Sequence, residues 1–131
     1  MARARVAAKR QGYRVLKVWQ RSMHVSAQVL RMTTKFSENR QFALAQQMQR
    51  AAISIPSNIA EGFNRNSRKE YAQFLGIVLG STGELETQCA LSVMAGFAAS
   101  KDFSFIVSEL DEIGKMLRAM IRTLKTPSPS D

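Results

Sequence analysis

Apolar residues recur at intervals of three and four along four long segments of this chain, which is the period of an α-helix that buries one face. The segments cover residues 13–36, 42–63, 71–96 and 105–124. Three prolines and seven glycines interrupt the 131 residues so rarely that few connections can form. The pattern therefore predicts an all-α fold, an antiparallel up-down bundle of four helices joined by short turns.

The chain is long enough for one domain with a hydrophobic core. We expect a basic flexible arm over residues 1–11, where no periodicity is present, the bundle over residues 12–125, and a disordered tail over residues 126–131. No apolar run approaches the roughly 20 residues of a membrane span, and the start of the chain lacks the apolar stretch of a secretory signal. With Cys89 as its one cysteine, the chain can form no internal disulfide, and we expect a cytoplasmic protein without a membrane association.

Local signals predict where two of the helices begin. Ser37 is a plausible N-cap of the second helix, with the acidic Glu38 next to it at the positive helix end. Ser67 and Glu70 have the spacing of a capping box, in which the hydroxyl and the carboxylate each accept a bond from a free amide. The third helix is therefore predicted to start at Ser67.

Pro56 lies inside the second apolar stripe. A proline within a helix lacks the N–H group and crowds the carbonyl four residues earlier, which belongs here to Ala52. Because the stripe keeps its phase through Ile59 and Phe63, the sequence predicts a helix that continues with a kink near Pro56.

Positive charge is concentrated at the start of the chain. Nineteen Lys and Arg oppose ten Asp and Glu, and residues 1–37 hold nine of the bases and no acid. Such a segment attracts polyanions, nucleic acid first and anionic lipid second, although a solubilising basic surface would have the same composition. The predicted nucleic-acid-binding residues are Arg3, Arg5, Lys9, Arg10, Arg14, Lys17 and Arg21.

Three glycines, Gly76, Gly80 and Gly83, lie within the third predicted helix. Each weakens a helix by about 1 kcal/mol relative to alanine, so we expect another backbone to approach closely there, from a neighbouring helix or from another subunit. Apolar residues outside the four stripes add surface that an oligomer could bury. They are Leu44, Ile53, Ile77, Leu79 and Leu91.

Residues for catalysis or metal binding are scarce. Di-metal sites in helical bundles use Glu-x-x-His pairs, but the one histidine, His24, follows Arg21 at that spacing. Cys89 falls on a core stripe, where a thiol behaves as a small hydrophobe. There is no glycine-rich phosphate loop. We therefore expect no enzymatic activity, no metal and no cofactor.

A group of polar residues surrounds Pro56 and recurs on the third predicted helix. It consists of Arg50, Ser54, Ser57, Asn58, Glu61, Arg65, Glu84, Glu86 and Gln88. These side chains could satisfy carbonyls freed by the proline, or they could line a subunit contact or a ligand-facing surface. Because unpaired charge at an interface is costly, we expect the acidic members to pair with Arg50 and Arg65, between helices or between subunits.

Residues 47–63, with the sequence QMQRAAISIPSNIAEGF, are followed by the motifs SRKEY at 67–71 and ELETQ at 84–88. Together they resemble the four-helix-bundle proteins first noticed in intervening sequences of bacterial 23S ribosomal RNA genes, and the resemblance covers about residues 13–125. Four positions, Ser37, Gln49, Asn64 and Cys89, depart from the residues frequent in that family, which concerns details of a shared surface rather than the fold.

This resemblance implies a helical bundle that assembles into rings of five subunits. It also implies kinship with accessory proteins of diversity-generating retroelements, which bind nucleic acid and a reverse transcriptase through basic surfaces. We therefore expect a non-enzymatic, homo-oligomeric scaffold, pentameric by resemblance, whose partner is nucleic acid or a nucleic-acid-processing protein. The alternative is a protein–protein adaptor with no nucleic-acid role.

Overall fold

The computed structural model describes residues 12–38 and 41–127. Within them the chain forms four long α-helices and two short 3-10 helices, which confirms the all-α prediction. In chain order the elements are η1 (Tyr13–Val15), α2 (Lys17–Glu38), α3 (Phe42–Phe63), α4 (Arg68–Met94), η2 (Ser100–Phe103) and α5 (Ser104–Lys125). None of these helices is long and apolar enough to cross a membrane.

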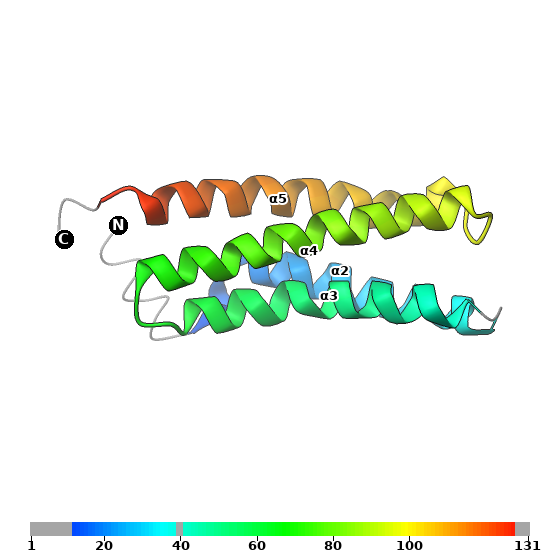
Figure 1. Ribbon diagram of the computed structural model, residues 1–131, viewed down its shortest axis with the longest axis horizontal. Coiled ribbons are helices and arrows are strands. Elements are labelled where there is room, and N and C mark those ends of the chain that lie inside the picture. Colours follow the sequence, from blue (N-terminus) through cyan, green and yellow to red (C-terminus); the bar gives the residue numbers. More distant parts are fainter. Residues whose placement is uncertain (1–11, 39–40, 128–131) are drawn as a thin grey trace.

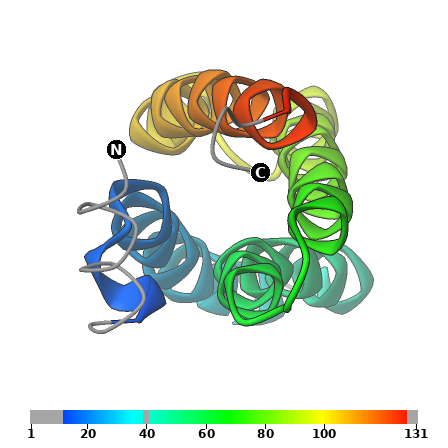
Figure 2. The same cartoon turned by 90° about the vertical axis from the view of Figure 1, so that its left-hand side faces the viewer.

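Consecutive helices run in opposite directions along the long axis of the molecule (Figure 1). Each packs against the next, and α5 returns to pack against α2. In the end-on view of Figure 2 the four helices surround a common centre, with α2 and α4 at opposite corners. In the part of the chain that the structure describes, helices at opposite corners do not neighbour each other.

The centre of the bundle is filled by apolar side chains from the predicted stripes. Side chains with no exposed surface come from all four helices: Val25, Val29, Met48, Ile55, Ile59, Leu75, Val78, Leu85, Ile106, Leu110, Ile113 and Leu117. Burial of one such side chain stabilises a fold by about 1.5–3 kcal/mol. Where α2 ends and α5 begins, the ring of Phe36 meets Phe97 and Phe103 edge to face, at 6.4 Å between ring centroids in both pairs.

The two predicted helix starts have different outcomes. Ser67 precedes α4, and its hydroxyl oxygen accepts a bond from the amide of Glu70 at 3.0 Å, so that prediction is confirmed. The prediction for Ser37 is wrong, because α2 continues through Glu38 and α3 begins after Gln41. Burial of Phe36 in the core holds the helix through this point, and the amide of Gln41 donates to the carbonyl of Phe36 at 2.9 Å.

α3 is one helix from Phe42 to Phe63 with Pro56 buried inside it, and the kink stays a prediction. The carbonyl of Ala52, which loses its helical donor to Pro56, accepts a bond of 2.6 Å from the hydroxyl of Ser26 on α2. Within α3, the side-chain amide of Asn58 donates to the carbonyl and the hydroxyl of Ser54, both at 2.9 Å. The proline is therefore accommodated by a neighbouring helix as well as by its own.

Replacement of Ser26 by alanine should lower the free energy of unfolding by about 1–3 kcal/mol, because it leaves a buried carbonyl without a donor. Pro56→Ala restores the N–H for that carbonyl, so the loss should be much smaller in this background. Urea unfolding of the two single variants, the double variant and the parent measures the coupling. Ser22→Ala is the control, since its hydroxyl donates to Val18 on the same helix. Equal losses in both backgrounds would contradict the assignment.

α3 approaches α4 closely at Gly62. A Cβ atom there would lie 2.6 Å from the Cβ of Phe74 and 3.2 Å from a ring carbon of Tyr71. In contrast, a Cβ atom on Gly76, Gly80 or Gly83 would meet no atom within 4 Å. The expectation that a neighbouring helix of the same bundle approaches these three glycines is therefore wrong, and contact with another subunit remains the prediction for them.

Gly62→Ala should lower the free energy of unfolding by about 1–3 kcal/mol, because the added methyl group overpacks the contact between α3 and α4. Gly76→Ala should instead raise it by up to about 1 kcal/mol, since alanine is the better helix former and the site has space. Chemical denaturation of both variants checks the difference. A Gly62→Ala protein as stable as the parent would show that the helices separate at little cost.

Candidate nucleic-acid interface

One end of the bundle collects positive charge from α2, α4 and α5 and from the segments before α2 and between α3 and α4. The start of α2, the end of α3, the start of α4 and the end of α5 all lie at this end (Figure 1). Within about two turns of it, the described bases are Arg14, Lys17, Arg21, Arg65, Arg68, Lys69, Arg118, Arg122 and Lys125. The described acids in the same turns are Glu61 and Glu70. We call these nine bases the basic end.

The acids of the structure collect further along the bundle. Glu84 and Glu86 lie in the second half of α4, and Glu109, Asp111 and Glu112 lie in the first half of α5. Most of the described acids therefore lie outside the basic end, although Glu109 adjoins it through its contact with Arg21. The nucleic-acid-binding residues predicted from the sequence lie only in the first third of the chain, so the contribution of α4 and α5 was missed.

Two of the predicted nucleic-acid-binding residues, Arg14 and Lys17, have exposed side chains at the basic end. The guanidinium of Arg14 lies 5.0 Å from the centre of the Tyr13 ring, and that ring packs against Trp19 at 5.3 Å. Four more, Arg3, Arg5, Lys9 and Arg10, lie outside the described residues.

Arg21 is engaged in an ion pair between α2 and α5. Its guanidinium donates to both carboxylate oxygens of Glu109, at 2.6 and 3.2 Å. This hydrogen bonding lowers the pKa of Glu109 below its ordinary value. Arg21 therefore joins two helices and is less available to a phosphate than Arg14 or Lys17.

Arg21→Gln should destabilise the protein at neutral pH, and the difference from the parent should shrink in acid. Since the folded state lowers the pKa of Glu109, the stabilisation is complete above the unfolded pKa and disappears as the pH falls through the folded one. Thermal unfolding from pH 7 to pH 3 measures it. Arg31→Gln is the control, because Arg31 bonds the uncharged Gln28. A difference that is independent of pH would show that the ion pair contributes nothing.

Two further bases at this end have partners in the chain. Arg68 donates to the carbonyls of Thr123 at 2.6 Å and Thr126 at 3.1 Å, which binds the start of α4 to the end of α5. Arg65 pairs with Glu61 at 2.9 Å and lies over the ring of Phe74. At this end, the exposed bases with no acidic partner among residues 12–38 and 41–127 are Arg14, Lys17, Lys69, Arg118, Arg122 and Lys125.

The polar residues around Pro56 form short contacts within and between α3 and α4. The hydroxyls of Ser54 and Ser81 are 3.0 Å apart across the two helices, and Asn58 bonds to Ser54. Ser81 was not among the predicted residues, and it is buried on the face of α4 that packs against α3. Ser57 is exposed to solvent. This part of the predicted cluster joins two helices of one subunit.

The charged members of that cluster are not paired with one another between α3 and α4. Arg65, which follows α3, bonds to Glu61 of that helix, and no ion pair joins Arg50 to Glu84 or Glu86 within the described residues. The side-chain amide of Gln88 donates to Glu84 at 3.4 Å, while its buried oxygen has no partner among the residues that the structure describes. Pairing between subunits therefore remains the open prediction for Glu84 and Glu86.

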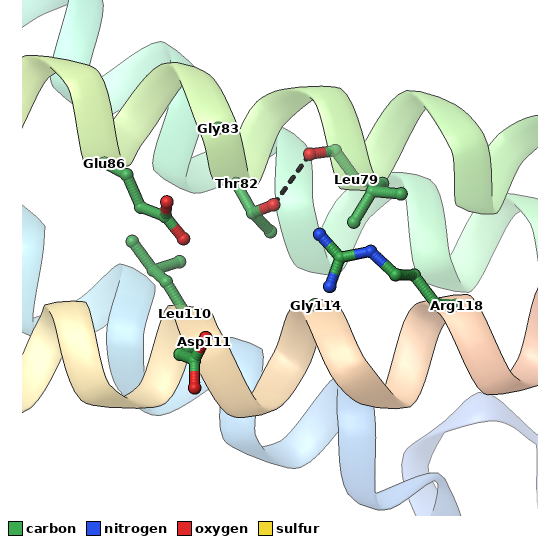
Figure 3. Close-up of a pocket in the computed structure, with 8 residues that line it drawn as sticks. All are labelled: Leu79, Thr82, Gly83, Glu86, Leu110, Asp111, Gly114 and Arg118. Atoms are coloured by element: carbon green, nitrogen blue, oxygen red, sulfur yellow. Dashed lines mark hydrogen bonds between the residues drawn. The ribbon is translucent and has the colours of Figure 1, made fainter.

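A half-open pocket of about 150 Å³ lies between α4 and α5 (Figure 3). Gly114 leaves room for the guanidinium of Arg118, since a Cβ atom there would lie 3.4 Å from it. Glu86 and Asp111 lie toward the other end of the pocket. The remaining lining residues are Leu79, Thr82, Gly83 and Leu110. The pocket thus places charges of both signs close together and has no strong preference for an anion.

Side chains that could bind a metal ion or take part in catalysis are dispersed among the described residues. No three His, Cys, Asp or Glu side chains of this part of the chain lie together in a way that could hold a metal ion. Cys89 is buried as predicted, and burial together with the nearby charge of Glu86 raises the pKa of its thiol to about 11. His24 is exposed. What the described residues bring together is exposed positive charge at the basic end, which attracts polyanions.

Comparison with known proteins agrees with the resemblance drawn from the sequence. The family model described as "23S rRNA-intervening sequence protein" matches residues 14–119. Among solved structures, the chain is similar to a protein of unknown function from the S23 ribosomal protein family of Bacteroides thetaiotaomicron VPI-5482. The two are 24% identical, the match covers 83% of this chain and 99% of the other, and the TM-score is 0.75. No curated protein matches the chain.

Proposed function

We propose, from the premise that the chain belongs to the 23S rRNA-intervening sequence protein family, that it is a non-enzymatic, homo-oligomeric scaffold that binds RNA or DNA. The basic end would bind the phosphate backbone. The observation that carries this proposal is the convergence at one end of nine bases, from α2, α4, α5 and the segments that flank them, while most of the described acids lie further along the bundle. When Lys and Arg side chains bind the phosphates of a nucleic acid, they release its counterions, so the affinity falls steeply as the salt concentration rises.

The aromatic residues at the basic end support binding to the backbone rather than to bases. Tyr13 packs against Trp19, and Phe63 packs against Tyr71. Proteins that stack bases present aromatic faces along a groove. With its rings packed against each other, this end offers charge without a stacking surface, so we expect little sequence specificity.

A scaffold role also agrees with the surface of α3 and α4. Ile53, Ile77 and Leu91 are each about half exposed, at 48%, 53% and 52%, which leaves apolar area for another chain. The family resemblance implies five subunits, and a ring would multiply the cationic sites. The same apolar residues favour the second candidate function, a protein–protein adaptor. For either role we propose a cytoplasmic location. Disulfides are rare in that compartment, and a chain with a single cysteine forms no internal disulfide.

Fluorescence anisotropy with labelled single- and double-stranded RNA and DNA, titrated at several salt concentrations, tests the nucleic-acid role. The basic-end variant carries glutamine at Lys17, Lys69, Arg122 and Lys125. The control carries glutamine at Arg31, Lys35, Arg50 and Lys101, all exposed and outside the basic end, so both lose four positive charges. We expect the slope of log K against log salt to fall by about 0.7–0.9 for each lost phosphate contact in the basic-end variant, and by much less in the control.

Equal losses in the two variants would mean that overall charge, and not the basic end, drives binding. A protein without residues 1–11 measures the share of Arg3, Arg5, Lys9 and Arg10. If the parent protein binds no nucleic acid even at low salt, the nucleic-acid role is wrong and the adaptor role is favoured.

A further inference from the structure

α4 presents a row of small residues to solvent. Gly76, Gly80, Gly83, Thr87 and Ala90 follow one another at steps of four and three, so they lie on one face, and all are exposed. Each of the three glycines has open space where a Cβ atom would be. We call this row the small-residue seam.

The seam has a bulky and acidic border. Ile77, Glu84 and Leu91 lie seven residues apart, which is close to two helical turns, so they form a line beside it. Ile77 and Leu91 are exposed at 53% and 52%. Glu84 is exposed between them, and Glu86 is exposed one turn beyond Gly83. The outer face of α4 thus combines shallow relief, apolar area and negative charge.

The outer face of α2 has the opposite character. Met23, Ala27 and Leu30 follow each other at steps of four and three, and Met23 and Leu30 are exposed at 44% and 39%. We call this row the bulky seam. Beside it, Lys17, His24 and Arg31 lie seven residues apart, and α2 carries no acid before Glu38. This face therefore combines projecting apolar side chains with positive charge.

We infer that the bulky seam of one copy packs against the small-residue seam of the next copy. This inference rests on the proposed self-association and names its surfaces. Projecting Met23 and Leu30 fit a row of glycines that lets two helices approach closely. The bases of α2 face the acids of α4, and such complementarity favours one orientation over others. It also gives Glu84 and Glu86 cationic partners, which they lack in the described part of a single subunit.

Contacts between identical faces are disfavoured by charge. Two α2 helices would bring together Lys17, Arg31 and their counterparts, and two antiparallel α4 helices crossing at Gly83 would oppose Glu84 to itself. Because α2 and α4 occupy opposite corners of the bundle (Figure 2), the contact between them is head-to-tail. Such contacts generate a closed ring when the rotation closes and a filament when it does not.

Two blocked variants test the pairing. Leu30→Glu places an acid on the bulky seam, opposite the acids of α4. Gly80→Arg fills the small-residue seam with a base, opposite the bases of α2. Each variant keeps one intact face, so each alone should be a monomer of 14.6 kDa, while their mixture should form a heterodimer of twice that mass. Light scattering with size-exclusion chromatography measures the masses, and circular dichroism confirms that the variants are helical.

Matched controls carry the same charges outside both seams. Phe105→Glu and Ser108→Arg change exposed residues of α5 and should leave the parent mass unchanged. If Leu30→Glu alone dimerises or assembles, α4 pairs with itself and the inference is overturned; if Gly80→Arg alone does so, α2 pairs with itself. A mixture that stays monomeric also overturns it. A monomeric parent protein would instead sink the self-association in the proposed function, and would leave nucleic-acid binding to its own assay.

Discussion

Burial of one apolar stripe from each of four helices is the interaction on which the rest of this structure depends. Each stripe is too wide to be covered by one neighbour, so the helices surround a common centre, and short connections make consecutive helices run in opposite directions. This arrangement decides which parts of a chain of 131 residues meet. It brings the start of α2 and the end of α5 to the same end, although about a hundred residues separate them in sequence.

The bundle also has to accommodate a backbone carbonyl that its own helix leaves without a donor, and a position where a side chain would not fit. Pro56 removes one amide from α3, and a serine of α2 donates to the carbonyl that would have accepted it. Gly62 has no side chain, which leaves room for Phe74 and Tyr71 of α4. Both residues lie within the segment that carries the family resemblance, so this segment is explained at least in part by packing. A direct role in binding is not needed to account for them.

The surface divides into regions with different properties. The basic end has an excess of bases over acids, the outer face of α4 has small residues with acids, and the outer face of α2 has bulky residues with bases. A protein that binds one partner through one surface needs only one such region. The presence of complementary faces beside a cationic end is what a scaffold requires, since assembly through the faces leaves the ends free to bind a polyanion.

Much of the architecture could be predicted because helices are specified locally. The period of the apolar residues gave four helices, the spacing of Ser67 and Glu70 gave the start of α4, and the stripe through Cys89 gave its burial. The prediction for Ser37 failed because burial of the adjacent Phe36 outweighed the capping preference of a serine. Of the candidate site, Arg14 and Lys17 were found because a run of bases is visible in sequence.

The tertiary structure alone decided the interactions between residues that are far apart in the chain. These include the bond from Ser26 to Ala52, the ion pair of Arg21 with Glu109, and the addition of Arg118, Arg122 and Lys125 to the basic end. It also decided that Gly62 is packed while Gly76, Gly80 and Gly83 are open. The physical reason is that helical periodicity tells which face of a helix is buried, but only the packing of the helices determines what each face meets.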